Sequence, residues 1–365
     1  MLAENIYAVI LAGGSGTRFW PKSRHKVPKQ LCKIGDADHT MIELTLARLD
    51  ELIPPSRRII VTHKDQLALT RSIVADSCEH FLAEPMARNT APALTLAALE
   101  IEAMAASVGQ SDPIMISLHA DALIKDEGAF REALYAMVGI AKKESLTLLG
   151  IRPEYPETGY GYIEKGLSIA ATAYRVRSFR EKPDLRTAQS YLETGHFLWN
   201  SGIFAWRVDT ILAELDRYFP AATEALRPLL TTSQVHRYCD LPSEVLADSY
   251  ARIPSMAIDP AVLERSQRVA VWEADIGWKD VGSWDALGSC FDADANGNLL
   301  LGDALQFDCQ GVTIDTDGPL VACIGLKDTI VVHARGAILV CPQERAQDVK
   351  KVVESLKAQG RTDLI

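Results

Sequence analysis

Short apolar runs alternate with helical patterns through the first 150 residues, and this alternation strongly limits the folds open to the chain. The expected strands lie at residues 7–11, 58–62 and 114–118, and the expected helices at residues 41–52, 90–107 and 129–144. Strands that alternate with helices at this spacing predict a mostly parallel sheet covered by helices on both faces. We therefore expect an α/β domain with a mixed, mostly parallel sheet.

The pattern changes after residue 150 and again after residue 290. Residues 150–180 favour sheet and loops, whereas residues 187–194 and 210–230 return to helical composition. The turn-rich sequence DANGN at residues 294–298 is followed by short, evenly spaced β-like runs. The runs lie at residues 304–307, 312–315, 320–324, 330–333 and 337–340, and a helix is expected at residues 344–358.

The chain is therefore expected to form two domains, a larger one at residues 1–290 and a small, mostly β domain at residues 295–365. Short, even strands suit either a sandwich or a β-solenoid, and the sequence leaves both open. The closing helix carries an apolar stripe formed by Val349, Val352, Val353 and Leu356.

Charge and cysteine usage exclude several classes of protein. The net charge of −10 argues against a surface that binds nucleic acid or anionic lipid. The seven cysteines form no C-x-x-C pair, which is typical of a reducing compartment. The sequence has no secretory signal pattern and no apolar stretch of the roughly 20 residues that a membrane span requires. We expect a cytoplasmic protein with neither nucleic acid nor membrane as partner.

A glycine-rich loop follows the first expected strand. It comprises Ala12, Gly13, Gly14, Ser15, Gly16 and Thr17. Glycines at this position let backbone N–H groups close on phosphate oxygens, which side chains would block. The spacing matches neither the dinucleotide fingerprint nor a Walker A loop, because the required later glycine or Gly-Lys-Ser/Thr is missing.

Basic residues cluster directly after this loop. They are Arg18, Lys22, Arg24, Lys26, Lys29 and Lys33, with no acidic residue before Asp36. A run of this kind is usually a solvated charged surface. Because the glycine loop adjoins it and two prolines fix its backbone, we interpret it as a cradle for a polyphosphate.

The sequence GGSGTRFWPKSR at residues 13–24, followed by PKQ at residues 28–30, resembles the signature of sugar nucleotidyltransferases. Its Trp20 and Pro-Lys-Gln forms are similar to the mannose-1-phosphate guanylyltransferase branch. The resemblance implies a Rossmann-like catalytic domain whose glycine loop wraps a nucleoside triphosphate. Arg18 and Lys29 would then neutralise the phosphates.

A second segment agrees with this family. Residues 84–93, EPMARNTAPA, resemble the guanylyltransferase segment beside the nucleotide base, which implies a nucleotide-binding role for Glu84, Arg88, Asn89 and Thr90. The alternative is a plain loop in which Asn89 or Thr90 caps a helix and Pro92 fits its first turn.

Two aspartates are candidate ligands for Mg²⁺. Asp121 ends a buried strand, where ligands gather in open α/β sheets, and Asp280 lies in a segment that resembles the family's second metal motif. Two neighbouring carboxylates repel each other unless a cation lies between them. The chain has His-Ala-Asp-Ala at residues 119–122, where the family usually has Pro-Ala-Asp-His, so the local geometry of the first site is expected to differ.

The sugar side of the family is matched by three further motifs. Gly161 lies in a loop similar to the sugar-side loop, Glu181 and Lys182 fit the acid-lysine-proline motif, and Asn200 fits the strand whose amide reaches the sugar. The resemblance implies that Glu181 binds sugar hydroxyls and that Lys182 binds the sugar phosphate. The alternative for Glu181 and Lys182 is an exposed ion pair of little energetic value.

The motifs occur in the family's order along nearly the whole chain. The resemblance implies transfer of GMP from GTP to mannose 1-phosphate with Mg²⁺. Alternatives are the same reaction with another sugar phosphate, such as a heptose, or another nucleotide, and a non-catalytic sensor of sugar nucleotides. From the length we expect no isomerase domain of the kind found in longer relatives, and an exposed face of the β domain could support a homodimer.

Overall fold

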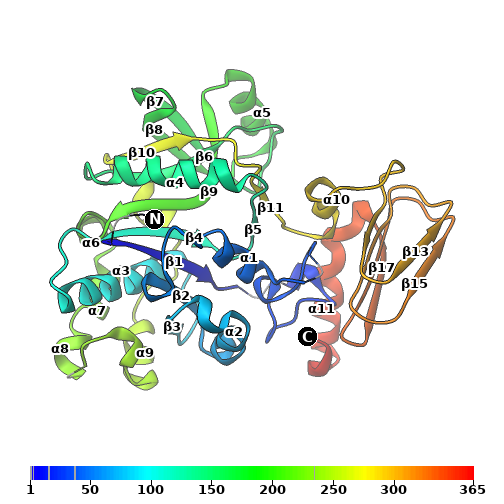
Figure 1. The fold of residues 1–365 in the computed structure, drawn as a ribbon, viewed down its shortest axis with the longest axis horizontal. Coiled ribbons are helices and arrows are strands. Elements are labelled where there is room, and N and C mark those ends of the chain that lie inside the picture. The colour runs from blue at the N-terminus through cyan, green and yellow to red at the C-terminus, as the bar shows by residue number, and fades with distance from the viewer. Residues whose placement is uncertain (1, 3, 15–16, 37, 234) are drawn as a thin grey trace.

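A computed structural model describes residues 2, 4–14, 17–36, 38–233 and 235–365. A nine-stranded mixed sheet forms the larger part, in the order β3-β2-β1-β4-β9-β6-β10-β8-β7 (Figure 1). Its strands are β1 (Ile6–Ala12), β2 (Arg58–His63), β3 (His80–Glu84), β4 (Ile114–His119), β6 (Leu146–Ile151), β7 (Gly161–Ala170), β8 (Ala173–Glu181), β9 (Phe197–Arg207) and β10 (Val269–Glu273). The α/β architecture predicted from the sequence is confirmed.

Helices cover both faces of this sheet because its central strands are apolar on both sides. Tyr7, Val9 and Leu11 of β1 pack into one buried cluster, and the alternate residues of β1 pack into the other. The first face is covered by α3 (Thr90–Ser107), α6 (Val208–Tyr218), α7 (Pro220–Leu226) and α9 (Ser243–Tyr250). The second is covered by α1 (Met41–Ala47), α2 (Leu67–Val74) and α4 (Glu127–Ala141).

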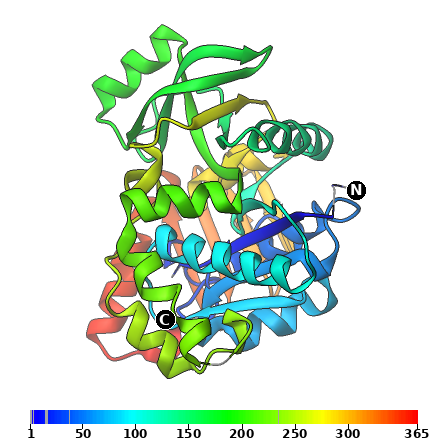
Figure 2. The ribbon, with the colours of Figure 1, turned by 90° about the vertical axis from the view of Figure 1, so that its left-hand side faces the viewer.

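Strand directions place the carboxyl ends of the mutually parallel strands, β2 and β3 among them, at one edge of the sheet. Strands β1 and β4 are parallel, β9 is antiparallel to both β4 and β6, and β10 is parallel to β6. Consequently β1, β4, β6 and β10 all end at the same edge, where ligands bind in open α/β sheets. The hairpin of β7 and β8, with α5 (Leu185–Thr194), stands above the rest of the sheet in Figures 1 and 2.

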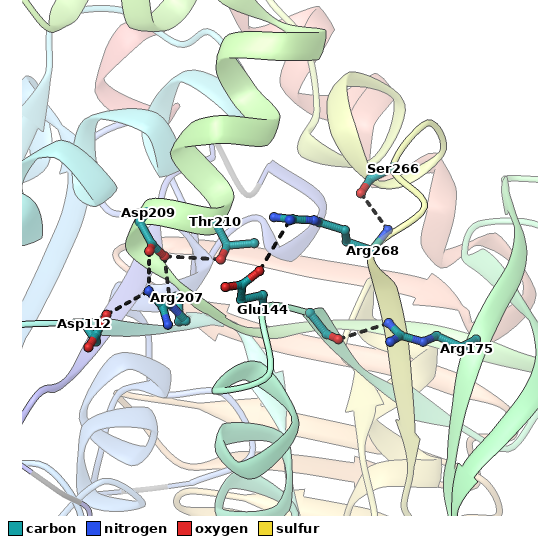
Figure 3. A network of polar contacts seen from close by, with 9 residues as sticks. Asp112, Glu144, Arg175, Arg207, Asp209, Thr210, Ser266 and Arg268 are labelled. Carbon is teal, nitrogen blue, oxygen red and sulfur yellow. Dashed lines mark hydrogen bonds and ion pairs between the residues drawn. The ribbon is translucent and has the colours of Figure 1, made fainter.

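The opposite edge carries a network of ion pairs and hydrogen bonds (Figure 3). Arg207 pairs with Asp112 and Asp209, and Arg268 pairs with Glu144. These partners are largely exposed, so each pair contributes little stability. The network fastens strand ends on the side away from the glycine loop.

Three predicted helices are shorter than expected. The helix expected at residues 344–358 begins as an α-helix only at Val349, after a 3-10 helix at Gln343–Asp348. The helix expected at residues 41–52 ends at Ala47, after which the chain forms tight turns with Glu51 at a φ of 65°. The helix expected at residues 210–230 divides into α6, α7 and α8 (Leu229–Ser233). Pro220 and Pro228 precede or begin the new helices, because proline lacks the N–H that continues a helical ladder.

The second part of the chain is a short β-solenoid. The parallel pairs β12–β14, β14–β16 and β13–β15 stack strands from successive turns of the chain, which decides between the two architectures left open by the sequence. Its strands are β12 (Leu299–Leu301), β13 (Ala304–Phe307), β14 (Thr313–Thr316), β15 (Val321–Ile324), β16 (Thr329–Ala334) and the antiparallel β17 (Ala337–Pro342).

Helix α11 (Val349–Ala358) joins the solenoid to the larger part of the molecule. Figure 1 shows α11 between the solenoid and the loops that follow β1. Val349 and Val353 of the predicted stripe are buried, in one cluster with Phe19 and Trp284 from outside the solenoid. The expected division between residues 290 and 295 stays a prediction.

Among the described residues, none of the helices combines the length and the apolar character that crossing a membrane requires.

Candidate functional site

Asp121 and Asp280 are brought together by a two-residue ladder. Asp121 lies in the turn between β4 and β5 (Ala122–Leu123), and Asp280 ends β11 (Lys279–Asp280). Antiparallel pairing of β5 with β11 sets Ala122 opposite Asp280. The Lys29 Nζ atom lies 3.2 Å from Asp121 Oδ2 and 3.5 Å from Asp280 Oδ1. The two candidate metal ligands therefore share one cation in this structure.

The two carboxylates are open, whereas the lysine is not. The side chains of Asp121 and Asp280 are 41% and 42% exposed, and that of Lys29 is 7% exposed. Burial raises the pKa of Asp121, but the Lys29 ammonium and the His119 ring outweigh this, so the pKa lies below its ordinary value. Asp121 is consequently ionised at neutral pH and available to a cation.

The altered His-Ala-Asp-Ala motif is accommodated by a glycine on β9. The His119 ring packs against Gly202, which has a φ of 73°. A Cβ atom at Gly202 would lie 2.7 Å from His119 Cδ2, so a larger residue would displace the ring. His119 thus packs the strand that precedes Asp121 against β9. Asn200 lies on β9 two residues before Gly202.

A cavity of about 340 Å³ lies between the glycine loop and the two aspartates. Its lining residues are Gly13, Gly14, Thr17, Arg18, Phe19, Lys29, Gln30, Asp121, Asp280 and Gly282. Gly14 has a φ of 114° and a Cβ direction that meets no atom within 4 Å, which leaves its backbone open to the cavity. Both Arg18 and Lys29 face this space, as an anion site requires.

Two residues of the predicted glycine loop, Ser15 and Gly16, lie outside the described residues. Ala12 is buried at the end of β1, and its carbonyl accepts hydrogen bonds from Gln30 and Thr62. Ala12 therefore stabilises the backbone at the start of the loop.

The interpretation of the six basic residues as one phosphate cradle was wrong for Lys22 and Arg24. Lys22 Nζ forms a buried ion pair with Asp315 Oδ1 on β14 at 2.5 Å. Arg24 donates hydrogen bonds to the backbone carbonyls of Arg335 and Asp363. Both side chains point toward the C-terminal part of the chain, and the partner of Lys22 lies 293 residues further along the sequence. Their proximity to the glycine loop in sequence gave no indication of these partners.

Glu84 lies at the end of β3, beside the glycine loop. Its Oε2 atom is 3.9 Å from the position of a Cβ on Gly13, and its Oε1 atom accepts a hydrogen bond from the Tyr250 hydroxyl at 3.1 Å. Burial raises the pKa of Glu84 to about 7, against the opposing effect of the Tyr250 hydrogen bond. A buried carboxyl group at this place is suited to hydrogen-bonding a polar group near the nucleotide loop.

The remaining residues of the predicted base-side segment mainly hold the fold in this structure. Asn89 caps α3 by accepting a hydrogen bond from Thr90 N at 2.8 Å, as predicted for one of the two residues. The Thr90 hydroxyl accepts a hydrogen bond from Ile258 N, and Arg88 donates to the carbonyl of Ala251.

Substitution of Glu84 by glutamine is expected to flatten the pH dependence of stability. Because the folded-state pKa of about 7 exceeds the ordinary 4.5, the wild type loses stability as pH rises between these values and levels off above. At each pH, the free energy of unfolding of the wild type is subtracted from that of the variant. This difference should be up to roughly 3 kcal/mol more favourable to the variant at pH 8 than at pH 5. Urea unfolding at pH 5, 6, 7 and 8 measures this, and parallel pH profiles for both proteins would contradict it.

The predicted sugar-side residues lie close to one another. Gly161 pairs with Glu181 across β7 and β8, and Glu181 Oε2 lies 2.7 Å from the position of a Cβ on Gly161. Lys182 Nζ lies 3.1 Å from Glu181 Oε1. Asn200 donates a hydrogen bond from Nδ2 to Asp259 Oδ1 at 2.9 Å. Glycine at 161 thus makes room for the Glu181 carboxylate.

Asp259 is a residue of this group that the sequence did not reveal. It begins a short π-helical turn, Asp259–Leu263, and its burial together with the charge of Glu181 raises its pKa to about 7. An isolated Asp-Pro pair in the sequence is typical of any turn, so no local signal singles it out.

A second cavity of about 410 Å³ includes Asp280 in its lining. Its walls include Tyr155, Tyr160, Trp199 and Trp278, whose rings contact one another edge to face. Trp199 is the neighbour of Asn200 on β9, and alternation along a strand directs neighbouring side chains to opposite faces. Asn200 therefore points to the other face of β9 from this cavity.

Comparison with known families identifies the family of the chain. The family model described as "Nucleotidyl transferase" matches residues 7–297, which is most of the chain. The chain belongs to the nucleotidyl transferase family. A second model, described as "MannoseP isomerase/GMP-like beta-helix domain", matches residues 302–356, which comprise most of the solenoid and of α11 in this nucleotidyl transferase.

Several relatives of this nucleotidyl transferase cover nearly all of it. The mannose-1-phosphate guanylyltransferase of Escherichia coli K12 is 37% identical over 99% of the chain, and a Salmonella typhimurium LT2 protein named mannose-1-phosphate guanylyltransferase ManC is 37% identical over the same share. The chain spans 75% of the length of each. A solved structure from Thermus thermophilus, described as mannose-1-phosphate geranyltransferase, is 35% identical with a TM-score of 0.86, covering 97% of this chain and 99% of that one.

Proposed function

We propose that this chain transfers GMP from GTP to α-D-mannose 1-phosphate, giving GDP-mannose and pyrophosphate. The observation that carries the proposal is the pair of aspartates joined by the β5–β11 ladder, facing a glycine-loop cavity with Arg18 and Lys29. The names of the relatives supply the substrates: GTP and mannose 1-phosphate are taken from proteins 37% identical to this one.

Asp121 and Asp280 fit a Mg²⁺ ion. Mg²⁺ usually binds one or two protein carboxylates, together with water and substrate phosphates. Within the described part of the chain, no group of three or more His, Cys, Asp or Glu side chains could hold a metal without such help. When bound, Mg²⁺ supplies positive charge that stabilises the reacting phosphates.

The remaining chemistry is alignment and charge neutralisation. An anionic phosphate oxygen of mannose 1-phosphate attacks the α-phosphorus of GTP, a new P–O bond forms, and the bond to the departing pyrophosphate breaks. The attacking oxygen is already ionised, so no general base is required. In this proposal Arg18 and Lys29 stabilise charge on the pyrophosphate, Lys182 holds the sugar phosphate, and Gly161, Glu181 and Asn200 contact the sugar. Holding both reactants in place can lower the barrier by roughly 7–11 kcal/mol.

The test is pyrophosphate release by the purified protein across a grid of nucleoside triphosphates and sugar 1-phosphates, with and without Mg²⁺. A single strong signal for GTP with mannose 1-phosphate, dependent on Mg²⁺, is the expected result. A stronger signal elsewhere, for example with a heptose 1-phosphate, would keep the mechanism and replace the substrate. Silence across the grid, combined with tight GDP-mannose binding, would replace the enzyme with a sensor.

We also propose that the protein acts in the cytoplasm, without nucleic acid or membrane partners, and as a homodimer. The net charge of −10 and the absence of C-x-x-C pairs support the first two points. For the dimer, the support is an apolar surface on the solenoid, where Leu305, Phe307 and Ile324 are exposed on the paired strands β13 and β15.

A further inference from the structure

Residues 250–259, here called the strap, run from the last residue of α9 to the first residue of the π-helical turn and are irregular between them. The strap begins beside the nucleotide side of the site. The Tyr250 hydroxyl donates to Glu84 Oε1 at 3.1 Å, and the Tyr250 side chain is fully buried. One residue later, the carbonyl of Ala251 accepts a hydrogen bond from Arg88 Nη2 at 3.1 Å. The first residues of the strap are thus fixed to two of the residues that the family resemblance places beside the base.

The middle of the strap runs along the start of α3. Met256 N donates to the carbonyl of Arg88 at 3.1 Å, and the carbonyl of Met256 accepts from Ala91 N at 3.0 Å. Ile258 N donates to Thr90 Oγ1 at 2.9 Å. Backbone groups of an irregular segment must find partners when buried, and here they find them on residues 88–91. The shapes of the two segments are therefore determined jointly.

The strap ends at the sugar side. Asp259 Oδ1 accepts a hydrogen bond from Asn200 Nδ2 at 2.9 Å, and Asn200 Oδ1 accepts one from Gly202 N at 3.2 Å. An amide nitrogen carries two hydrogens, so one N–H of Asn200 remains to be offered to a ligand. Asp259 fixes the direction in which this N–H points. The π-helical turn that Asp259 begins packs against β8, the strand that ends at Glu181, which places Asp259 beside the other sugar-side residues.

We propose that the strap couples the two substrate sides of the site, with Asp259 as the positioning residue that orients Asn200 toward the sugar 1-phosphate. The inference rests on the proposed nucleotidyl transfer. It adds a physical link between the nucleotide-side and the sugar-side residues that the sequence motifs of either side do not include. Coupling of this kind is reciprocal: a change at the Tyr250 end alters binding at the Asn200 end, and the reverse. Asp259 opens a π-helical turn, a type of structure often found at functional sites.

The first experiment compares Asp259→Ala, Asp259→Asn and Glu264→Gln by separate KM values for GTP and mannose 1-phosphate. The alanine variant should raise KM for mannose 1-phosphate by about tenfold, as expected for loss of one well-placed hydrogen bond, and change KM for GTP far less. The asparagine variant keeps an acceptor oxygen and should restore most of the loss. Glu264 is near the same Glu181 charge, so its glutamine variant is the matched control and should behave as wild type.

The second experiment tests the coupling itself with Tyr250→Phe, which removes the hydroxyl bound to Glu84 and leaves the sugar side untouched. It should raise KM for GTP and also, by about two- to threefold, KM for mannose 1-phosphate. In the Asp259→Ala background the second effect should vanish, because the connection is already cut.

An unchanged KM for mannose 1-phosphate in folded Asp259→Ala, or a Tyr250→Phe effect confined to GTP, would overturn the proposal. If Asp259→Ala does not fold, the Tyr250→Phe measurement decides alone. Wild-type turnover in the same assay separates these outcomes from failure of the proposed function, which would leave no turnover to perturb.

Discussion

Replacing Asp121 or Asp280 by asparagine is expected to lower turnover by on the order of 10²- to 10⁴-fold while the protein stays folded. Each substitution keeps the shape of the side chain and removes one negative charge from the pair that faces the glycine-loop cavity. Because both carboxylates are about 40% exposed, their contribution to stability is small compared with their contribution to cation binding. The effect should appear in kcat, measured by pyrophosphate release at saturating substrates.

A second measurement separates loss of the cation from other defects. Binding of Mn²⁺ to the substrate-free protein, followed by electron paramagnetic resonance, should weaken in both variants. Asp275→Asn is the matched control, because this exposed aspartate lies five residues before Asp280 and accepts a hydrogen bond from Gly277 N that an asparagine can keep. Near-native turnover in both Asp121 and Asp280 variants would show that the metal assignment is wrong.

Truncating Asp315 to alanine is expected to lower the free energy of unfolding by about 3–5 kcal/mol, the cost of leaving a buried charge without its partner. Asp315 is 1% exposed and Lys22 is nearly as buried, so water cannot replace the lost carboxylate. Burial raises the pKa of Asp315 despite the Lys22 ammonium, which indicates that desolvation is the larger effect at this place. Urea unfolding at pH 7 measures the loss.

The paired variant Lys22→Met with Asp315→Leu tests the cause. Replacing both charges by apolar side chains removes the desolvation penalty together with the attraction, so much of the lost stability should return. Asp317→Ala on the neighbouring exposed turn is the control and should change stability by less than about 0.5 kcal/mol. An Asp315→Ala variant as stable as wild type would mean that the ion pair does not stabilise the contact between the solenoid and the segment that follows the glycine loop.

Local patterns were sufficient to predict most of the secondary structure. The helix at Thr90–Ser107 and the strand at Ala304–Phe307 have the predicted bounds, because capping residues and β-forming runs act over a few residues. The short β5 and β11 could not be predicted. Two-residue strands carry no pattern of their own, and their pairing depends on tertiary structure that brings residues 122 and 280 together.

Site residues could be predicted where a family motif indicates both the role of a residue and its place in the fold. Asp121 and Asp280 lie close together as the motifs suggested, whereas their shared contact with Lys29 was not predicted. Lys22 was misassigned because a basic side chain in a loop has no sequence signal for its partner, which here lies on the solenoid. Asp259 was missed for a related reason, since its partner Asn200 is distant in sequence.

The same long-range contacts can form only late in translation. The loop after β1 emerges early from the ribosome, yet its Trp20 indole donates to the carbonyl of Leu364 and its Lys22 pairs with Asp315. The Trp20 indole and the Lys22 ammonium therefore stay without these partners while about 300 further residues are translated. A nascent chain released before residue 315 would already contain every residue proposed to contact substrate, but it would lack the contacts of Lys22 with Asp315 and of Trp20 with Leu364.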